Sequence, residues 1–266
     1  MNTIHAILLL INIGIFPAYE NAKKSFGFIH DQIALVKKNH MSPPADIMKD
    51  AIDFNKTLMD LGTMRASGFV YNHRQKVTQI VTNDHVCKDL DLENKNPLAL
   101  RVKGIVQKKL SETNPLLFLY FDLEYRIVVT SFSGIHHEIT GIEKSDKETD
   151  LCVLNTKDIW GVPVEINETE CMPSEEVYNI SASGGLYYPG AFPIRRGFYN
   201  GIVFDEYMTD NVYKTRGLYT LNIESGASGS AVFNGKGKVC GNISHTVKNS
   251  DVSFGSTVEE LKTFLR

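Results

Sequence analysis

The sequence predicts an all-β fold: two packed six-stranded antiparallel β-barrels with an N-terminal helical extension and a short C-terminal helix. Roughly thirteen short runs, rich in β-branched and aromatic residues, alternate with turn residues between residues 68 and 255. No helix-length periodic stretch stands out in that region. Two barrels account for this strand count within 266 residues, whereas a parallel α/β sheet would require helices between its strands.

The N-terminus resembles an export signal. Residues 1–18 contain no Asp, Glu, Lys or Arg, and Ala6 to Phe16 are nearly all apolar. Eleven residues are too few to span a bilayer but match the apolar region of a secretory signal. We expect residues 1–18 to be a signal peptide, and the protein to be secreted or periplasmic. The weak basic flank and the vague cleavage site leave an uncleaved anchor or a buried N-terminal segment as alternatives.

Residues 19–62 form the next unit. Apolar residues recur at three- and four-residue intervals in IALVKK (residues 33–38) and in DIMKDAIDFNKTLMDLG (residues 46–62), with a Pro-Pro pair between them. This spacing predicts one or two short helices in an extension that is a propeptide, a cap or a packing arm. Residues 63–266 then hold both barrels, and TVEELKTFLR at the end (residues 257–266) places its apolar residues on one helical face.

Composition narrows the possible partners and cofactors. The net charge is −3 with no long basic run, so we expect no nucleic-acid partner and no stable membrane partner. Cys87, Cys152, Cys171 and Cys240 fit no metal-ligand spacing, so the cysteines do not predict a metal site. Export would permit one or two disulfides, whose pairing the sequence does not determine; buried free thiols are the alternative for Cys152 and Cys240.

One stretch suggests nucleophilic catalysis. GASGSAVFN (residues 226–234) places Ser228 in a glycine-rich turn before an apolar strand. A serine nucleophile needs a base, usually His, and the base needs an acid to orient it. Among the eight histidines, His85 directly follows an apolar strand, whereas the His136-His137 pair resembles solvated loop residues. Asp150 opens a strand and is a stronger candidate acid than Asp122 or Asp146.

The order His85, Asp150, Ser228, each at the edge of a β-segment, resembles the trypsin-like (chymotrypsin-fold) serine proteases, closest to the HtrA-like and glutamyl endopeptidase branches. The resemblance covers about residues 60–266. The matching pieces are ASGFVYN (66–72), IVTNDHV (80–86), TDLCVL (149–154), GASGSAVFN (226–234) and GKVCGNIS (237–244).

This resemblance implies a serine endopeptidase that acts on a protein or peptide substrate without a metal or cofactor. Ser228 would attack the peptide carbonyl and form an acyl-enzyme. His85 would act as the base and then as the acid, and Asp150 would orient it. The backbone N–H groups of Gly226 and Ser228 would form the oxyanion hole.

The sequence also departs from the family pattern. Ala227 stands where animal digestive relatives have an Asp that holds a new N-terminus after cleavage, so that activation route is not expected here. About 25 to 30 extra residues between His85 and Asp150 predict a long loop or hairpin near the cleft.

By family register, Asn222 forms the floor of the primary specificity pocket, and Ile243, Ser244 and His245 lie near its wall. Ser244 would also reach Asp150. Glutamyl endopeptidases place a His at the Ile243 position, so acidic specificity is not supported unless a shifted register brings His245 there. Asn222 argues against a strong preference for Arg or Lys. We therefore expect the primary specificity pocket to bind a small or uncharged polar residue of the substrate.

Two other functions are compatible with parts of this pattern. An inactive binding protein on the same fold would usually lack one member of the triad, whereas all three are present. An α/β-hydrolase esterase would need the chain order Ser, acid, His and a Gly-x-Ser-x-Gly turn that leads into a helix. Here the motif is Gly-Ala-Ser-Gly-Ser and a strand follows, which disfavours that reading.

Overall fold

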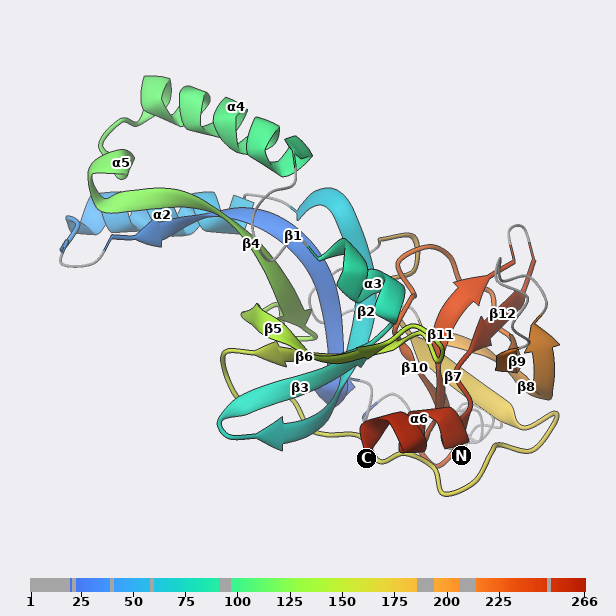
Figure 1. Ribbon diagram of the computed structural model, residues 1–266. Coiled ribbons are helices and arrows are strands. Elements are labelled where there is room, and N and C mark those ends of the chain that lie inside the picture. Colours follow the sequence, from blue (N-terminus) through green and yellow to red (C-terminus); the bar gives the residue numbers. More distant parts are fainter. Residues whose placement is uncertain are drawn as a thin grey trace, which may run out of the picture.

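The structure, a computed structural model, contains two closed six-stranded antiparallel β-barrels (Figure 1). It describes residues 20, 23–38, 41–57, 60–90, 97–185, 194–205, 214–247 and 250–266. The predicted all-β fold of two barrels is therefore confirmed. The predicted signal peptide lies outside the described residues. Within them, no helix is both long and apolar enough to cross a membrane.

The first barrel has the strand order β1-β2-β3-β6-β5-β4. Its strands are β1 (Phe26–Lys37), β2 (Asp60–Arg74), β3 (Val77–Thr82), β4 (Phe121–Ser131), β5 (His136–Asp146) and β6 (Leu151–Thr156). The second barrel has the order β10-β11-β12-β9-β8-β7. Its strands are β7 (Glu176–Ile180), β8 (Ile194–Asp205), β9 (Lys214–Thr220), β10 (Ala231–Asn234), β11 (Val239–Thr246) and β12 (Val252–Gly255).

The helices are few. They are α2 (Ala45–Thr57), α3 (Asp84–Asp89), α4 (Pro97–Thr113), α5 (Leu117–Tyr120) and α6 (Val258–Leu265), with a short 3₁₀ turn η1 (Ser183–Gly185). The C-terminal helix α6 is confirmed. A capping box starts it: the Thr257 hydroxyl accepts from the Glu260 N–H, and the Glu260 carboxylate accepts from the Thr257 N–H.

The helical interpretation of residues 33–38 is wrong, because Phe26–Lys37 form strand β1. This strand pairs with β2 on one side and with β4 on the other, from Gly27 opposite Ser131 to Lys37 opposite Phe121. Ten consecutive residues of β1 are buried, so no polar face alternates with an apolar one. An apolar run without alternation does not distinguish a strand from a helix.

The second part of the predicted extension is confirmed as a helix, α2 (Ala45–Thr57). The first barrel nevertheless takes its strand β1 from within residues 19–62, and β2 begins at Asp60, before the predicted boundary at residue 63. Removing residues 19–62 as a propeptide would therefore take one of six strands out of the barrel.

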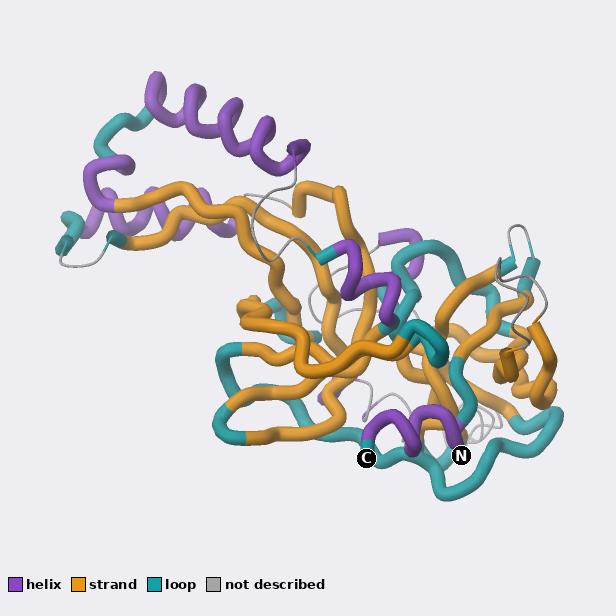
Figure 2. Tube along the Cα trace, in the orientation of Figure 1, coloured by secondary structure: helices purple, strands orange, loops and turns teal. Residues whose placement is uncertain are grey.

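The extra residues between His85 and Asp150 also differ from expectation. In place of the predicted loop or hairpin, residues 97–113 form helix α4 (Pro97–Thr113), and α4 contains the run ALRVKGIVQ (residues 99–107), which belongs to the apolar runs counted as candidate strands. Val102, Val106 and Leu110 recur every four residues and pack inward, as expected for one face of a helix. The short apolar run was ambiguous between the two structures. Helices α2, α4 and α5 gather on the part of the β1–β4 ribbon that projects away from the second barrel (Figures 1 and 2).

We call this projecting part the helical lobe; it consists of α2, α4, α5 and the far ends of β1 and β4. It has its own apolar cluster, with buried Ile33, Leu35, Ile47, Ala51, Leu117, Phe121 and Leu123. Asn55 of α2 covers the open edge of β1. Its side chain accepts from the Leu35 N–H at 2.7 Å and donates to the Leu35 carbonyl at 3.0 Å. It thereby satisfies both backbone groups of that residue, as a neighbouring strand would.

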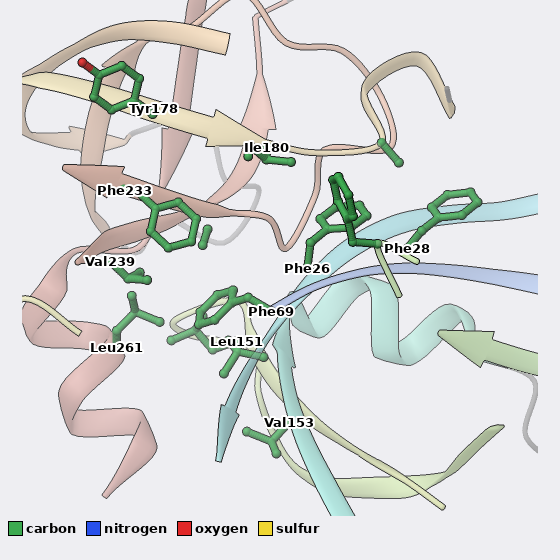
Figure 3. Packing of buried hydrophobic residues seen from close by; sticks show 14 residues of the cluster. Phe26, Phe28, Phe69, Leu151, Val153, Tyr178, Ile180, Phe233, Val239 and Leu261 are labelled. Carbon is green, nitrogen blue, oxygen red and sulfur yellow. The ribbon is translucent and has the colours of Figure 1, made fainter. Parts of the chain in front are cut away.

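A larger apolar cluster joins the two barrels (Figure 3). The first barrel contributes Phe26, Phe28, Phe69, Leu151 and Val153, and the second contributes Tyr178, Ile180, Phe233 and Val239, with Leu261 from α6. These side chains are almost completely buried. The barrels are thus held together by a continuous core, which fixes the position of the loops that meet along it.

Each disulfide lies within a single barrel, one in the first barrel and one in the second. Cys87 of α3 is bonded to Cys152 of β6, and Cys171 is bonded to Cys240 of β11. All four cysteines of the chain are therefore paired, and the free-thiol interpretation of Cys152 and Cys240 is wrong. The first disulfide fastens α3 to β6, the two elements next to which the candidate base and acid lie.

Candidate active site

His85 lies in the first turn of α3, directly after strand β3. Its side chain is about half exposed, so it is accessible to a ligand at the junction. Asn83 is the residue before the helix, and its side chain does not cap it. The Asn83 amide instead donates to the Asp150 carbonyl oxygen at 2.9 Å. Cys87, two residues after His85, anchors the helix to β6.

Asp150 lies one residue before β6 and is buried. Its carboxylate accepts from the His85 backbone N–H at 3.1 Å, and both carboxylate oxygens lie 3.0 Å from His85 Nδ1. Its φ of 55° is unusual for a residue with a side chain. A backbone in this region persists only when neighbouring contacts fix it.

Those contacts come from three directions. The Asn83 amide holds the Asp150 carbonyl. The guanidinium of Arg216, a fully buried residue of β9, donates to the Thr149 carbonyl at 3.0 Å. The Ser244 hydroxyl of β11 donates to the Asp150 carboxylate. The second barrel thus supplies two of the groups that fix this acid.

The electrostatics favour an ionised acid. Burial raises the pKa of the Asp150 carboxyl, but the hydrogen bonds and charge of His85, together with the Ser244 hydroxyl, outweigh burial and hold the pKa below its ordinary value. An ionised Asp150 accepts the Nδ1–H of His85. That bond selects the tautomer of His85 that leaves Nε2 free to accept a proton.

Ser228 lies in the turn between β9 and β10 and is partly buried. Its hydroxyl donates to the Ser244 carbonyl at 3.3 Å. This bond is long, so a rotation about Cα–Cβ can exchange it at little cost. Ser244 therefore contacts both ends of the arrangement: its carbonyl contacts Ser228, and its hydroxyl contacts Asp150.

Two glycines allow this turn. Gly226 has φ of 96° and Gly229 has φ of 86°, values that residues with a side chain rarely adopt. A β-carbon on Gly229 would lie 2.2 Å from both the Ser67 carbonyl oxygen and the Thr82 hydroxyl. The chain can therefore pass behind Ser228 only with glycine at this position.

The structure places the predicted specificity residues Asn222, Ile243 and His245 in three different surroundings. Asn222 is exposed in the connection before Ser228. Ile243 is buried in the second-barrel core with Ile223 and Ala227. His245 is half-buried and stacks on Phe254, with ring centroids 4.8 Å apart. The structure records no side-chain hydrogen bond between Asn222 and any described residue.

Several residues of the site were not identified from the sequence. Asn83 lies inside the TNDHV motif and Ser67 inside ASGFVYN, so both belonged to matching segments without an assigned role. Arg216 gave no signal, because nothing in its local sequence indicates that β9 faces the acid. His137, interpreted as solvated, is instead buried in β5 and stacks on Trp160.

No metal site accompanies these residues: within the described ranges, no group of three or more His, Cys, Asp or Glu side chains is arranged to hold a metal ion. The arrangement contains an exposed imidazole oriented by a buried carboxylate and a hydroxyl on a glycine-rich turn. Such groups are suited to nucleophilic attack on a carbonyl with proton transfer.

Comparisons with known proteins agree with this fold. The model of the trypsin-like peptidase domain matches residues 66–241, more than half of the chain. The active form of the Rv3671c protease from M. tuberculosis is 14% identical with a TM-score of 0.61, over 96% of this chain and 85% of that one. The HtrA-type protease AlgW with a decapeptide is 15% identical with a TM-score of 0.58, over 95% of this chain and 65% of that one.

No curated protein matches the sequence. At identities this low, the similar structures support the fold, and the family match rests on the sequence itself. Both barrels, the order of the motifs and the domain match lead to one assignment: the chain belongs to the trypsin-like peptidase domain family.

Proposed function

We propose that the protein is a serine endopeptidase that cleaves peptide bonds through an acyl-enzyme intermediate, with Ser228 as nucleophile, His85 as base and Asp150 as orienting acid. One observation supports this most strongly. The carboxylate of Asp150 is buried and lies 3.0 Å from His85 Nδ1, while Ser244 connects the same carboxylate to the Ser228 hydroxyl. A protein that only binds ligands has no need of this chain of contacts.

In the proposed cycle, Ser228 Oγ attacks the substrate carbonyl and its proton passes to His85 Nε2. The charged imidazole is stabilised by Asp150 and then gives the proton to the leaving amine. Water, deprotonated by His85, attacks the acyl carbon, and the second product leaves with Ser228 restored. The negative oxygen of each tetrahedral intermediate is bound by the N–H groups of Gly226 and Ser228.

The substrate is a protein or peptide, and we propose that it carries a small or uncharged polar residue at the cleaved bond. The side chain of Ile243 is apolar and buried, and Asn222 carries no charge to pair with Arg or Lys. A peptide ligand is also in keeping with AlgW, which was solved with a decapeptide.

We propose further that the protein acts in the secreted or periplasmic space. Two disulfides that pair every cysteine favour an oxidising compartment. The apolar segment from Ala6 to Phe16 supports the same location. N-terminal sequencing of exported protein tests this: a mature chain that begins after residue 18 supports export, and a chain that retains its first residues in the cytoplasm contradicts it.

An active-site fluorophosphonate tests the nucleophile. The reagent phosphonylates a serine that is activated by a neighbouring base, with loss of fluoride. The wild-type protein is expected to gain one adduct, located on Ser228 by peptide mass mapping. Ser228→Ala is expected to gain none. Wild-type protein that is folded but not labelled would instead favour the inactive binding protein.

A further inference from the structure

We propose that Ser67 and Ser230 are positioning residues that hold the loop around Ser228 so that two backbone N–H groups stay free for the oxyanion. The inference rests on the proposed function. It assigns a role to two hydroxyls that lie outside the triad, one in each barrel. Both serines are fully buried, so their hydroxyls are used inside the protein and not by solvent.

In the backbone of residues 224–228, the carbonyl groups are hydrogen-bonded to described residues, whereas some of the N–H groups are not. Every carbonyl in this segment accepts a hydrogen bond. The Glu224 carbonyl accepts from the Ala227 N–H, and the Ser225 carbonyl accepts from the Gly184 N–H. The Gly226 carbonyl accepts from the Ser67 hydroxyl, the Ala227 carbonyl from the hydroxyl and N–H of Ser230, and the Ser228 carbonyl from the Ser67 N–H. By contrast, the N–H groups of Gly226 and Ser228 donate to no group in the part of the chain that the structure describes. The loop is therefore fixed by its carbonyls.

Holding a carbonyl also fixes the direction of the N–H in the same peptide unit. In a trans peptide, the C=O and N–H groups point in opposite directions, and the unit is rigid and planar. The Ser225 carbonyl is held by the Gly184 N–H at 2.8 Å, which directs the Gly226 N–H the other way. The Ala227 carbonyl is held by Ser230, which does the same for the Ser228 N–H.

Ser67 secures the peptide between these two units. Its hydroxyl donates to the Gly226 carbonyl at 2.7 Å and accepts from the Ala182 N–H at 3.1 Å. Its own N–H donates to the Ser228 carbonyl at 2.8 Å. Because Ser67 lies in β2, the first barrel thereby holds a loop of the second barrel from behind.

Ser230 secures the other side. Its hydroxyl donates to the Ala227 carbonyl at 2.6 Å, and its N–H donates to the same oxygen at 2.9 Å. The Ser230 hydroxyl also accepts from the Asn179 amide at 2.8 Å. That donor fixes the direction of the hydroxyl proton toward Ala227, because the lone pair facing Asn179 is already used.

The turn η1 completes the support. The Ser183 hydroxyl accepts from the Glu224 N–H at 2.7 Å, and Gly184 has φ of 68° and contacts Ser225. No charged group takes part in these contacts around the loop, and Ala227 at its centre is buried and apolar. Neutral hydrogen bonds therefore hold this loop in place.

The experiment compares Ser67→Ala and Ser230→Ala with wild type in turnover of a peptide substrate and in affinity for a peptide aldehyde. The aldehyde accepts Ser228 Oγ at its carbonyl carbon, and the new oxyanion occupies the proposed hole. Ser67→Ala is expected to lower kcat about tenfold to a hundredfold with KM within about twofold, and to weaken aldehyde affinity by a similar factor. Ser230→Ala is expected to act less, because the Ser230 N–H still holds Ala227.

Ser253→Ala is the matched control. Ser253 is as buried as Ser67, but its hydroxyl has no partner among the described residues. It should retain wild-type kcat. If Ser67→Ala does not fold, as judged by thermal unfolding, Ser230→Ala carries the test.

Two outcomes overturn the inference, and a third overturns the proposed function on which it rests. Ser67→Ala and Ser230→Ala both within about twofold of wild type in kcat would show that the hydroxyls do not position the loop. A raised KM with unchanged kcat would make them substrate-binding residues. Wild-type protein without Ser228-dependent turnover would overturn the proposed function itself, so the two failures are distinguishable.

Discussion

Strands β1 and β4 each run through two different regions, the junction between the barrels and the helical lobe. At one end, Phe26 and Phe28 of β1 pack into the core between the barrels, beside the candidate active site. At the other end, Ile33 and Leu35 of the same strand pack into the helical lobe. Both ends bury apolar side chains. The end between the barrels also lies next to the hydrogen-bonded groups of the candidate site, among them buried Asp150 and Ser244.

The contrast teaches that burial alone does not mark a functional region. In the helical lobe, the Asn55 side chain satisfies backbone groups at an edge of β1. At the junction, the buried side chains of Asn83 and Ser244 hold the buried Asp150, and Asp150 orients the half-exposed His85. Changes at the junction should therefore alter catalysis, and changes in the helical lobe should alter stability alone.

The largest effect is expected from Asp150→Asn. The amide would present a donor to His85 Nδ1 and favour the wrong tautomer, so kcat should fall by about 10⁴ while KM changes little. Steady-state kinetics on a peptide substrate measures this. Asp122→Asn, the same change at the exposed far end of β4, should keep wild-type kcat. A fall of less than about tenfold in Asp150→Asn would remove Asp150 from the proposed triad.

Removing the disulfide next to the site should have a large effect on stability. The Cys87–Cys152 bond closes a loop of 65 residues, so Cys87→Ala/Cys152→Ala should lose about 4 kcal/mol of unfolding free energy. Urea denaturation measures the loss. Cys171→Ala/Cys240→Ala is the matched variant in the second barrel, with a loop of 69 residues. A double variant of Cys87 and Cys152 with wild-type stability and kcat would contradict a positioning role for this link.

His30 lies on β1 between the two regions and should make stability depend on pH. Burial, with a smaller contribution from His136, lowers the pKa of His30 to about 3 from 6.5. Between these values the unfolded chain binds a proton that the folded chain does not, so stability falls as the pH falls. The expected loss from this group between pH 7 and pH 4 is about 3 kcal/mol. Denaturation of wild type and His30→Gln at both pH values measures it, and equal acid sensitivity of the two would contradict it.

The smallest effect is expected in the helical lobe. Asn55→Ala removes both hydrogen bonds to Leu35 and should cost about 1 to 2 kcal/mol of unfolding free energy. The kcat on a peptide should not change, because the lobe lies away from the second barrel. Asn55→Asp keeps the acceptor for the Leu35 N–H but places a carboxylate oxygen against the Leu35 carbonyl, so it should also be less stable than wild type. A loss of kcat in a stable Asn55→Ala protein would break the distinction between the two regions.

The sequence predicted the junction better than the helical lobe for a physical reason. The segments around His85, Asp150 and Ser228 carry constraints that are local: a strand end, a turn, glycines with positive φ. Strand β1 was misinterpreted because both of its faces are buried, and α4 because a short apolar run fits a strand or a helix equally well.

Other features depend on contacts between distant residues, which no local pattern encodes. The pairing of Cys87 with Cys152 follows from the packing of α3 on β6. The same holds for Arg216, which reaches Thr149 from the other barrel, and for Ser67, which reaches Gly226. Family register predicts Asn222 and His245 as specificity residues; in the structure Asn222 is exposed in the connection before Ser228, and His245 stacks on Phe254.

The central claim is that Ser228 cleaves peptide bonds, and the most direct measurement is cleavage of a peptide library by wild-type protein and by Ser228→Ala, with mass-spectrometric identification of the products. The account predicts internal cleavage by the wild type, with small or uncharged polar residues before the cut bond, and no cleavage by Ser228→Ala. Equal cleavage by both proteins, or none by folded wild type, would contradict it.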